Sequence, residues 1–402
     1  MNIEKLIKNK LFFYTLLCYN IRQWWCFGMK TKVRDSNYEL LRIISMIWIV
    51  IWHTVINSAL LYRTSGSVNF SFNFLFMIIV VHVNLFMLIT GYYQSKSEFK
   101  LKKVISFLLQ IAFYNLIINS IFKVFGLVEY TNVEFLKQIA FYNSYSYWFF
   151  SCYIITYIIS PFLNKFIVNL DKKEFKKLIG CLVLCFSVLP FLTGNLLFST
   201  NGYSVYQFVL MYFIGAYIRK FNLNKNLLKK INISQKRVIY IAIFILCTIF
   251  NFSLIYLQKQ MAVLDSNILN SLANIMKDYS IFYNNPLVII QTISLFLLFG
   301  TFDFKNKVIN KISSLTFGVY LIHESYYMRM NLYKWIGIDN GKMIYGKSIL
   351  LKVFVWAIII FILCAIIEWI RQLLFKLISK LRFVEKIDSK FMTWLTNILE
   401  IK

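Results

Sequence analysis

Proline and charged side chains are scarce in this chain. Its 402 residues include 3 prolines and 13 glycines, and 15% of them are charged, against about 25% in a typical soluble domain. The hydrophobic fraction is 59%. These values exclude a disordered protein, a coiled coil and a secreted disulfide scaffold, and they argue against a soluble enzyme. With a mean hydropathy of +0.63, the chain is expected to be a multi-pass membrane protein.

Acidic residues are also few, at 17 against 44 basic residues, which gives a net charge of +27. A charge of this size can indicate nucleic-acid binding, but the basic residues occur in short runs between apolar segments and form no continuous stripe. We therefore interpret them as topology signals and expect no nucleic-acid partner. The seven cysteines form no C-x-x-C pair, so we interpret them as packing residues and expect no bound metal or cofactor.

Ten apolar runs follow one another along the chain. They cover approximately residues 39–61, 70–93, 104–125, 147–168, 178–198, 203–218, 238–257, 285–301, 312–328 and 349–375. A crossing helix needs about 20 residues, so the short, amphipathic runs 203–218 and 312–328 are the weakest candidates. The pattern predicts an all-α bundle of about ten transmembrane spans.

The basic residues give the sidedness of this scheme. If the N-terminus is cytoplasmic, 33 Lys and Arg residues fall on the inner side and 10 on the outer side, with Arg42 inside the first run. The positive-inside rule then predicts that both termini are cytoplasmic. Residues 1–38 are expected to form a basic tail that lies at the membrane interface, with Met29 as a possible true start. Residues 39–377 are expected to form the membrane domain, and 378–402 a second basic tail.

Arg42 and His53 are the most informative polar residues inside the runs. Eleven helical positions make about three turns and a rise of about 16 Å, so both side chains share one helix face, Arg42 near the cytoplasm and His53 about halfway across. Glu39 can pair with Arg42 at i, i+3 spacing. The alternatives are a snorkelling arginine and a histidine that only bonds a neighbouring helix.

Two further polar pairs lie in the runs. His82 and Asn84 are expected at a depth similar to that of His53, either facing a substrate or joining helices by hydrogen bonds. His323 and Glu324 lie near the outer end of the ninth run, where they are substrate-side candidates or groups exposed at the interface.

Charged groups also stand at the inner ends of the runs. Lys102 and Lys103 open the third run at the cytoplasmic face, where they suit a phosphate or act only as topology signals. Glu368 is expected to pair with Arg371 at i, i+3 spacing.

Together these residues describe a group transfer. A neutral imidazole at mid-depth can remove a proton from a hydroxyl. An arginine and lysines at the cytoplasmic mouth can hold the phosphates of an anionic donor. The chemistry that follows is transfer from a cytoplasmic phosphorylated carrier toward the membrane interior or the far side.

The chain resembles the acyltransferase-3 family of integral membrane O-acyltransferases over approximately residues 34–380. The first span has the family's basic residue, ten intervening positions and histidine, at Arg42 and His53. Four more segments resemble the family in the expected order, at residues 84–92 (NLFMLITGY), 147–164 (YWFF through SPFLN), 212–217 (YFIGAY) and 314–323 (SLTFGVYLIH).

The resemblance implies a standalone bacterial enzyme of the cytoplasmic membrane with about ten spans. Members take an acetyl or longer acyl group from cytoplasmic acyl-CoA, as a donor substrate, and place it on a sugar hydroxyl of surface polysaccharide, capsule, lipopolysaccharide or a peptidoglycan precursor. It implies that His53 is catalytic and that Arg42 binds the donor or orients the site. Glu39, which the spacing pairs with Arg42, is a third catalytic candidate. Lys102 and Lys103 stand where many members have arginine.

Several alternatives stay open on the sequence. His53 can act as a general base, or it can carry the acyl group itself. A flippase or exporter of a lipid-linked sugar would also be a basic, aromatic, multi-pass protein, although it would need no histidine at this spacing from an arginine. A polysaccharide polymerase or glycosyltransferase would require acidic residues in an outer loop, and the outer carboxylates form no evident set.

Overall fold

The computed structural model describes residues 34–129, 147–193, 201–261, 282–339, 341–344 and 346–378, together with the isolated positions 131, 133–134, 268 and 270. Most of the expected terminal tails, residues 1–38 and 378–402, therefore lie outside the described residues. The secondary structure within the described ranges is helical apart from one isolated β-bridge between Thr64 and Ile344. The expected all-α class is confirmed.

Within the described part of the chain, seven helical segments are long and apolar enough to cross a membrane. They are α2 (Ser36–Asn57), α4 (Gly66–Ile79) with α5 (His82–Gln94), α6 (Leu101–Val124), α8 (Trp148–Asn169), α9 (Lys172–Val183) with the π-helical turn Leu184–Val188 and α10 (Leu189–Thr193), α13 (Ile233–Met261) and α19 (Ser348–Ile378). Their length and composition indicate a multi-pass membrane protein.

The remaining helices are shorter. They are α3 (Leu60–Arg63), α11 (Val205–Lys220), α12 (Leu223–Asn226), α15 (Pro286–Phe299), α16 (Lys307–Ser313), α17 (Thr316–His323) and α18 (Tyr326–Trp335). Every predicted apolar run contains a helix, but α11, α15 and α17 have 16, 14 and 8 residues, fewer than the about 20 of a simple span. The count of ten and the cytoplasmic termini therefore remain predictions.

Short polar signals fix where several helices begin. Asp171 and Glu174 form a reciprocal capping box at the start of α9. The Asn285 side chain accepts a hydrogen bond from the Leu287 N–H, and Pro286 follows at the first position of α15. Such caps satisfy N–H groups that have no partner within the helix. The sequence thus defines the first residue of α9 and of α15.

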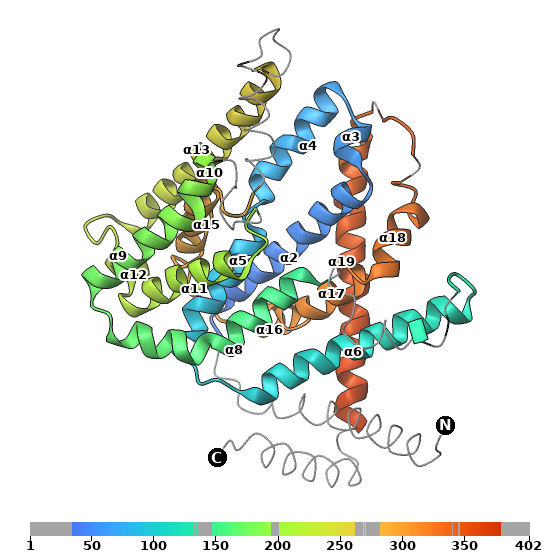
Figure 1. Ribbon diagram of the computed structural model, residues 1–402, viewed down its shortest axis with the longest axis horizontal. Helices are drawn as coiled ribbons and strands as arrows, with labels where there is room; N and C mark the ends of the chain where they lie inside the picture. Colours follow the sequence, from blue (N-terminus) through green and yellow to red (C-terminus); the bar gives the residue numbers. More distant parts are fainter. Residues whose placement is uncertain are drawn as a thin grey trace.

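Helix α2 lies in the middle of the bundle (Figure 1) and contacts α5, α15, α16, α17 and α19. Its C-terminal end is held by Arg63, which donates hydrogen bonds to the Ser58 carbonyl at 2.9 Å and to Asp339 at 3.2 Å, beside the bridge between Thr64 and Ile344. Helix α17, which contacts α2, comes some 270 positions later in the chain.

Helices α5 and α11 pack backbone against backbone. A Cβ atom added at Gly91 would lie 2.2 Å from the Tyr212 carbonyl oxygen, and one added at Gly215 would lie 2.3 Å from the Leu88 carbonyl oxygen. Small residues permit this close approach between membrane helices.

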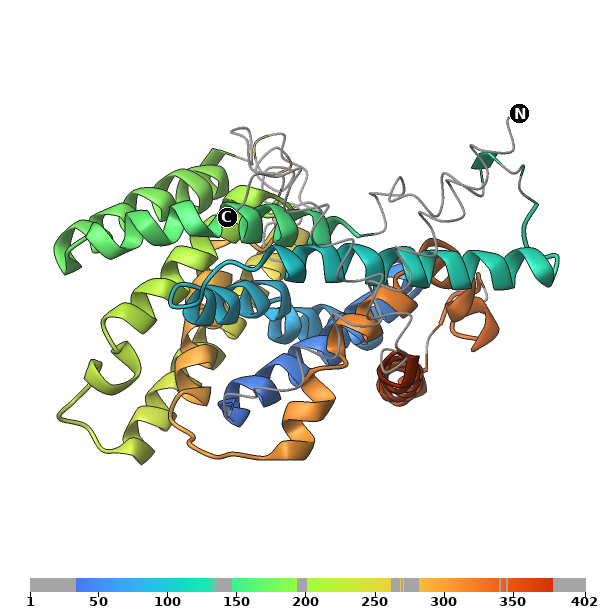
Figure 2. The ribbon, with the colours of Figure 1, turned by 90° about the horizontal axis from the view of Figure 1, so that it is seen from below.

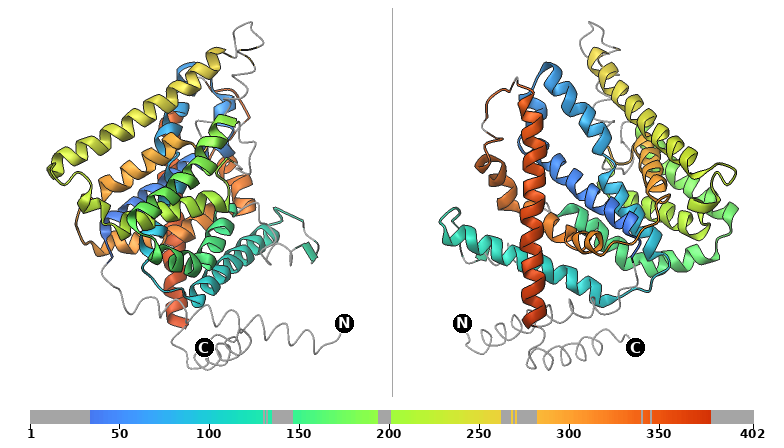
Figure 3. Two further views of the ribbon diagram at one scale, coloured as in Figure 1. Left: turned by 60° about the vertical axis from the view of Figure 1, so that its left-hand side comes forward. Right: turned by 180° about the vertical axis from the view of Figure 1, so that it is seen from behind.

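Helix α19 runs beside α17 along the length of the bundle (Figure 3) and is seen nearly end-on in Figure 2. Its Glu368 forms a two-bonded ion pair with Arg371, at 2.7 and 2.8 Å, which confirms the predicted i, i+3 pair. The same carboxylate accepts hydrogen bonds from Gln110 and Tyr114 of α6. Gly318 of α17 packs on Glu368, so this buried cluster joins α6, α17 and α19.

Candidate functional site

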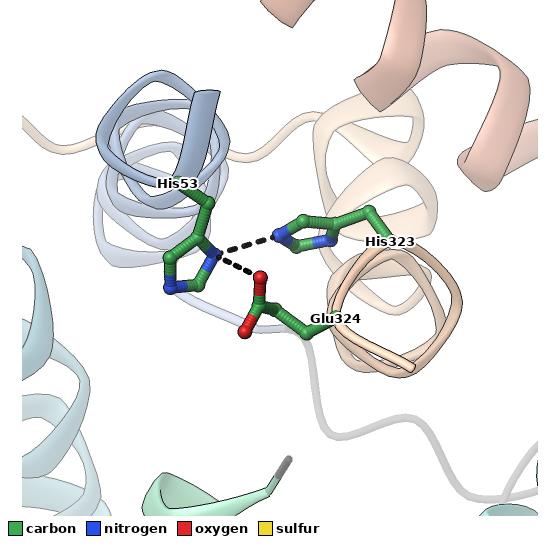
Figure 4. Close-up of side chains that lie close together, drawn as sticks. All are labelled: His53, His323 and Glu324. Atoms are coloured by element: carbon green, nitrogen blue, oxygen red, sulfur yellow. Dashed lines mark hydrogen bonds and ion pairs between the residues drawn. The ribbon is translucent and has the colours of Figure 1, made fainter. Parts of the chain in front are cut away.

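Three ionisable side chains converge between α2 and the end of α17. The Nδ1 atom of His53 lies 3.0 Å from Nε2 of His323 and 3.2 Å from Oε1 of Glu324. Figure 4 shows the second ring nitrogen of His53 pointing away from both partners. We refer to His53, His323 and Glu324 as the His–His–Glu cluster.

The hydrogen bonds of the cluster fix its proton positions. Nδ1 of His323 lies 2.6 Å from the Val319 carbonyl oxygen, which can only accept, so the His323 proton is on Nδ1. In a neutral imidazole the other nitrogen, Nε2, then accepts. Both partners of His53 Nδ1, the His323 nitrogen and the Glu324 carboxylate, are therefore acceptors. His53 carries its proton on Nδ1, and its Nε2 holds a lone pair.

Two more side chains hold the Glu324 carboxylate. Asn57 donates a hydrogen bond to Oε1 at 3.2 Å, and NH1 of Arg329 lies 3.6 Å from Oε2. Such charge-assisted contacts favour the ionised carboxylate. The carboxylate is therefore arranged to stabilise positive charge on the His53 ring.

The short helix α17 places the cluster. The Tyr147 hydroxyl donates to the Leu321 carbonyl at 2.9 Å, and Glu324 stands directly after the last helical residue, His323. His53 comes from a continuous part of α2. His53 therefore lies on the continuous helix α2, and its two partners lie at the end of α17, which the hydrogen bond from Tyr147 holds in place.

His323 and Glu324 are more enclosed than the sequence predicted. We expected exposure at the membrane interface, but their exposed fractions are 0% and 5%. That expectation was wrong because the end of α17 packs against α2, α18 and α19. The His53 side chain retains 18% exposure. His53 is therefore the member of the cluster that a substrate can reach.

A second charged group lies three turns away, at the other end of α2. NH1 of Arg42 lies 3.0 Å from Oε1 of Glu39, which confirms the predicted pair. Glu39 also accepts a hydrogen bond from Ser313 of α16, and Arg34 lies 3.8 Å from it. The structure therefore places Glu39 beside Arg42 and not beside His53.

Lys103 lies on the same side of the bundle as Arg42. Its Nζ is 4.5 Å from the centre of the Tyr157 ring, a distance at which cation–π attraction acts. The Tyr157 ring is stacked on Tyr153 with centres 6.4 Å apart, and Tyr153 lies within electrostatic range of Arg42. Lys102 is exposed on α6. Arg42 and Lys103 thus stand near one aromatic pair, whereas Lys102 faces outward.

His82 and Asn84 belong to a separate buried network. His82 bonds the Ile79 carbonyl at 2.6 Å and lies 3.3 Å from the Tyr283 hydroxyl. Asn84 donates to the Tyr283 carbonyl and accepts from Gln207 of α11. These are the interhelical hydrogen bonds that the sequence left as the alternative. Among the described residues, neither side chain has a hydrogen bond or ion pair to the His–His–Glu cluster, although His82 lies within electrostatic range of His53.

Two residues of the site, Asn57 and Arg329, were not singled out from the sequence, and Tyr147 was noted only as the first residue of the segment 147–164 that resembles the family. Asn57 could have been found, because it follows His53 by four positions and therefore lies on the same helix face. The contacts of Tyr147 and Arg329 carry no such signal, since their partners come from another helix or a loop.

The arrangement supports two kinds of chemistry. The free nitrogen of His53, backed by a carboxylate, suits proton removal from a hydroxyl. Two imidazoles and a carboxylate could also hold a metal ion.

A comparison with protein families supplies independent evidence. The acyltransferase domain model of the acyltransferase-3 family matches residues 35–375, a range that includes every residue of the cluster. No similar curated protein and no similar solved structure were found. The match covers most of the chain, so this multi-pass membrane protein is an acyltransferase that belongs to the acyltransferase-3 family.

Proposed function

We propose that the protein moves an acetyl or longer acyl group from cytoplasmic acyl-CoA to a hydroxyl of a cell-surface or exported carbohydrate. The observation that carries this proposal is the His53 ring. Both partners of its Nδ1 are acceptors, so Nε2 has a lone pair and points away from them. A histidine held in this tautomer is suited to act as a general base.

The proposed reaction is a direct transfer. The acceptor hydroxyl gives its proton to His53 Nε2 while its oxygen bonds to the thioester carbonyl carbon. The carbon–sulfur bond then breaks, and the leaving thiolate takes the proton from the imidazolium, which yields an ester and a free thiol. Glu324 and His323 stabilise the imidazolium through Nδ1. In the alternative, Nε2 itself receives the acyl group and passes it on.

The cytoplasmic end of α2 is the proposed donor side. Arg42 and Lys103 lie near the Tyr153–Tyr157 pair, where two cations and aromatic faces suit the phosphates and the base of a nucleotide. Glu39 is 4% exposed and paired with Arg42. We therefore assign Glu39 the role of holding Arg42, with no direct part in the chemistry.

The acceptor is proposed to be a carbohydrate of a bacterial cell envelope, with the protein in the cytoplasmic membrane. This part rests on the resemblance of the five sequence segments and on the family match. A transporter of lipid-linked sugars has no comparable support in the site, because it would not need a histidine in a fixed tautomer.

Mass spectrometry of surface glycans tests the proposal. Glycans from cells with and without the intact gene are compared before and after mild alkali, beside cells that carry His53→Ala. We expect an alkali-labile acyl mass that is present only with the intact gene. If the glycan masses are unchanged while the amount or chain length of the surface glycan falls, the transport or polymerisation function is correct and the proposal fails.

A further inference from the structure

The His–His–Glu cluster has the composition of a zinc site. One ligand atom from each of His53, His323 and Glu324 can be chosen so that all lie within 4.8 Å of one another. Two histidines and one glutamate are a set that zinc uses in proteins, with a fourth position left to water or substrate. Among the described residues, no other group of three such side chains comes together in this way.

The spacing of the ligand atoms fits the ion. Ligand atoms about 2.0–2.1 Å from a tetrahedral zinc ion lie about 3.3 Å from one another. The separations here are 3.0 Å between the two histidine nitrogens and 3.2 Å between His53 Nδ1 and Glu324 Oε1. Both separations are close to that spacing, and the third, between His323 and Glu324, is at most 4.8 Å.

The hydrogen-bond partners of the three ligand side chains are also of the kind found around metal sites. His323 donates its other ring N–H to the Val319 carbonyl, and Glu324 is held by Asn57 and Arg329. Outer partners of this kind orient metal ligands and strengthen binding.

We infer that the His–His–Glu cluster binds a zinc ion and that zinc reversibly inhibits the enzyme. The ion bonds Nδ1 of His53, Nε2 of His323 and a carboxylate oxygen of Glu324. Because Nδ1 then holds the metal, the single proton of the neutral His53 ring moves to Nε2. The lone pair that would accept a proton from the acceptor hydroxyl is lost. The inhibition rests on the proposed function, whereas the binding does not.

Equilibrium binding to the purified full chain tests the site directly. The protein in detergent is treated with a chelator, titrated with Zn²⁺ alone, and its bound metal is measured by elemental analysis. We expect one zinc ion per chain. His323→Gln and Glu324→Gln are each expected to weaken binding by at least the roughly 10- to 100-fold that loss of an outer-shell partner costs.

Two control variants separate this site from others on the chain. His82→Gln removes a buried histidine outside the cluster. The double variant Cys181→Ser, Cys185→Ser removes two exposed thiols that lie four positions apart. Both are expected to bind zinc as the wild type does. Equal binding by the wild type and the cluster variants, or loss of binding only in the cysteine variant, overturns the inference.

Activity assays distinguish the inference from the proposed function. Zinc binding without any acyl transfer would remove the proposed function and leave the site. Acyl transfer that depends on His53 but is unaffected by bound zinc would overturn the inhibition and leave the proposed function. Restoration of a metal-free, inactive enzyme by zinc would also overturn it, because zinc would then be a cofactor.

Discussion

At the scale of single residues, His53 owes its function to the two acceptors at its Nδ1. His323 is fixed as an acceptor by its own bond to Val319, and Glu324 is a carboxylate held by Asn57. Either partner alone would favour the same His53 tautomer, and only Glu324 also adds a negative charge. The two neighbours therefore have separable roles, one in orientation and one in charge.

The charge role of Glu324 can be tested with Glu324→Gln. The amide oxygen can still accept from His53 Nδ1, but it no longer stabilises an imidazolium. General acid–base catalysis typically contributes about 10²–10⁴-fold, so we expect kcat to fall by about 10²-fold or more while the KM for acyl-CoA changes little. Steady-state kinetics on the purified enzyme measure both constants.

Asp339→Asn is the matched control for this substitution. Asp339 is a carboxylate near the C-terminal end of α2 that pairs with Arg63 and is not part of the cluster. Its variant is expected to retain the wild-type kcat. A Glu324→Gln enzyme with wild-type kcat would remove the carboxylate from the mechanism.

The sequence indicated the members of the site but not their contacts. Arg42, His53 and Glu39 share one helix, so 3.6-residue periodicity predicts how they lie. The bond between His53 and His323 joins positions 270 apart. It depends on how α17 packs against α2, which one sequence does not specify. For the same reason, His323 and Glu324 were expected at the surface.

At the scale of helices, the contact between α5 and α11 leaves no room for a larger side chain at Gly91. Gly91→Ala would place a methyl group 2.2 Å from the Tyr212 carbonyl oxygen, so the two backbones must move apart. Overpacking of this kind typically costs about 1–3 kcal/mol. We expect a lower melting temperature in detergent, measured by thermal unfolding.

Gly180→Ala in α9 is the matched control. A Cβ atom at Gly180 would meet no atom of another helix within 4 Å, and alanine favours a helix over glycine by roughly 0.5–1 kcal/mol. The melting temperature should therefore stay the same or rise. A Gly91→Ala protein as stable as the wild type would show that α5 and α11 do not pack this closely.

Hydropathy located the helices better than it located their ends. The run 312–328 contains the end of α16, all of α17 and the start of α18, with Glu324 and Ser325 at the junction between the last two. The run 70–93 is interrupted at Val80 and Val81. A window of apolar residues cannot distinguish one helix from two that meet inside the membrane. In the ninth run, that junction carries the partners of His53.

At the scale of the whole molecule, the distribution of Lys and Arg predicts cytoplasmic termini. A reporter enzyme that is active only outside the cytoplasm should be inactive when fused at the C-terminus. The same reporter inserted within residues 262–281, between α13 and α15, should be active, because the positive-inside scheme places that connection outside. Activity at the C-terminus together with inactivity between α13 and α15 would invert the scheme.

The most direct test of the central claim is acyl transfer by the purified protein in a lipid bilayer. Labelled acetyl-CoA and an envelope glycan are supplied, and label in the glycan is measured for the wild type and for His53→Gln. The account predicts that His53→Gln folds with the wild-type melting temperature and transfers about 10²–10⁴-fold more slowly. A folded His53→Gln protein that transfers at the wild-type rate would contradict it.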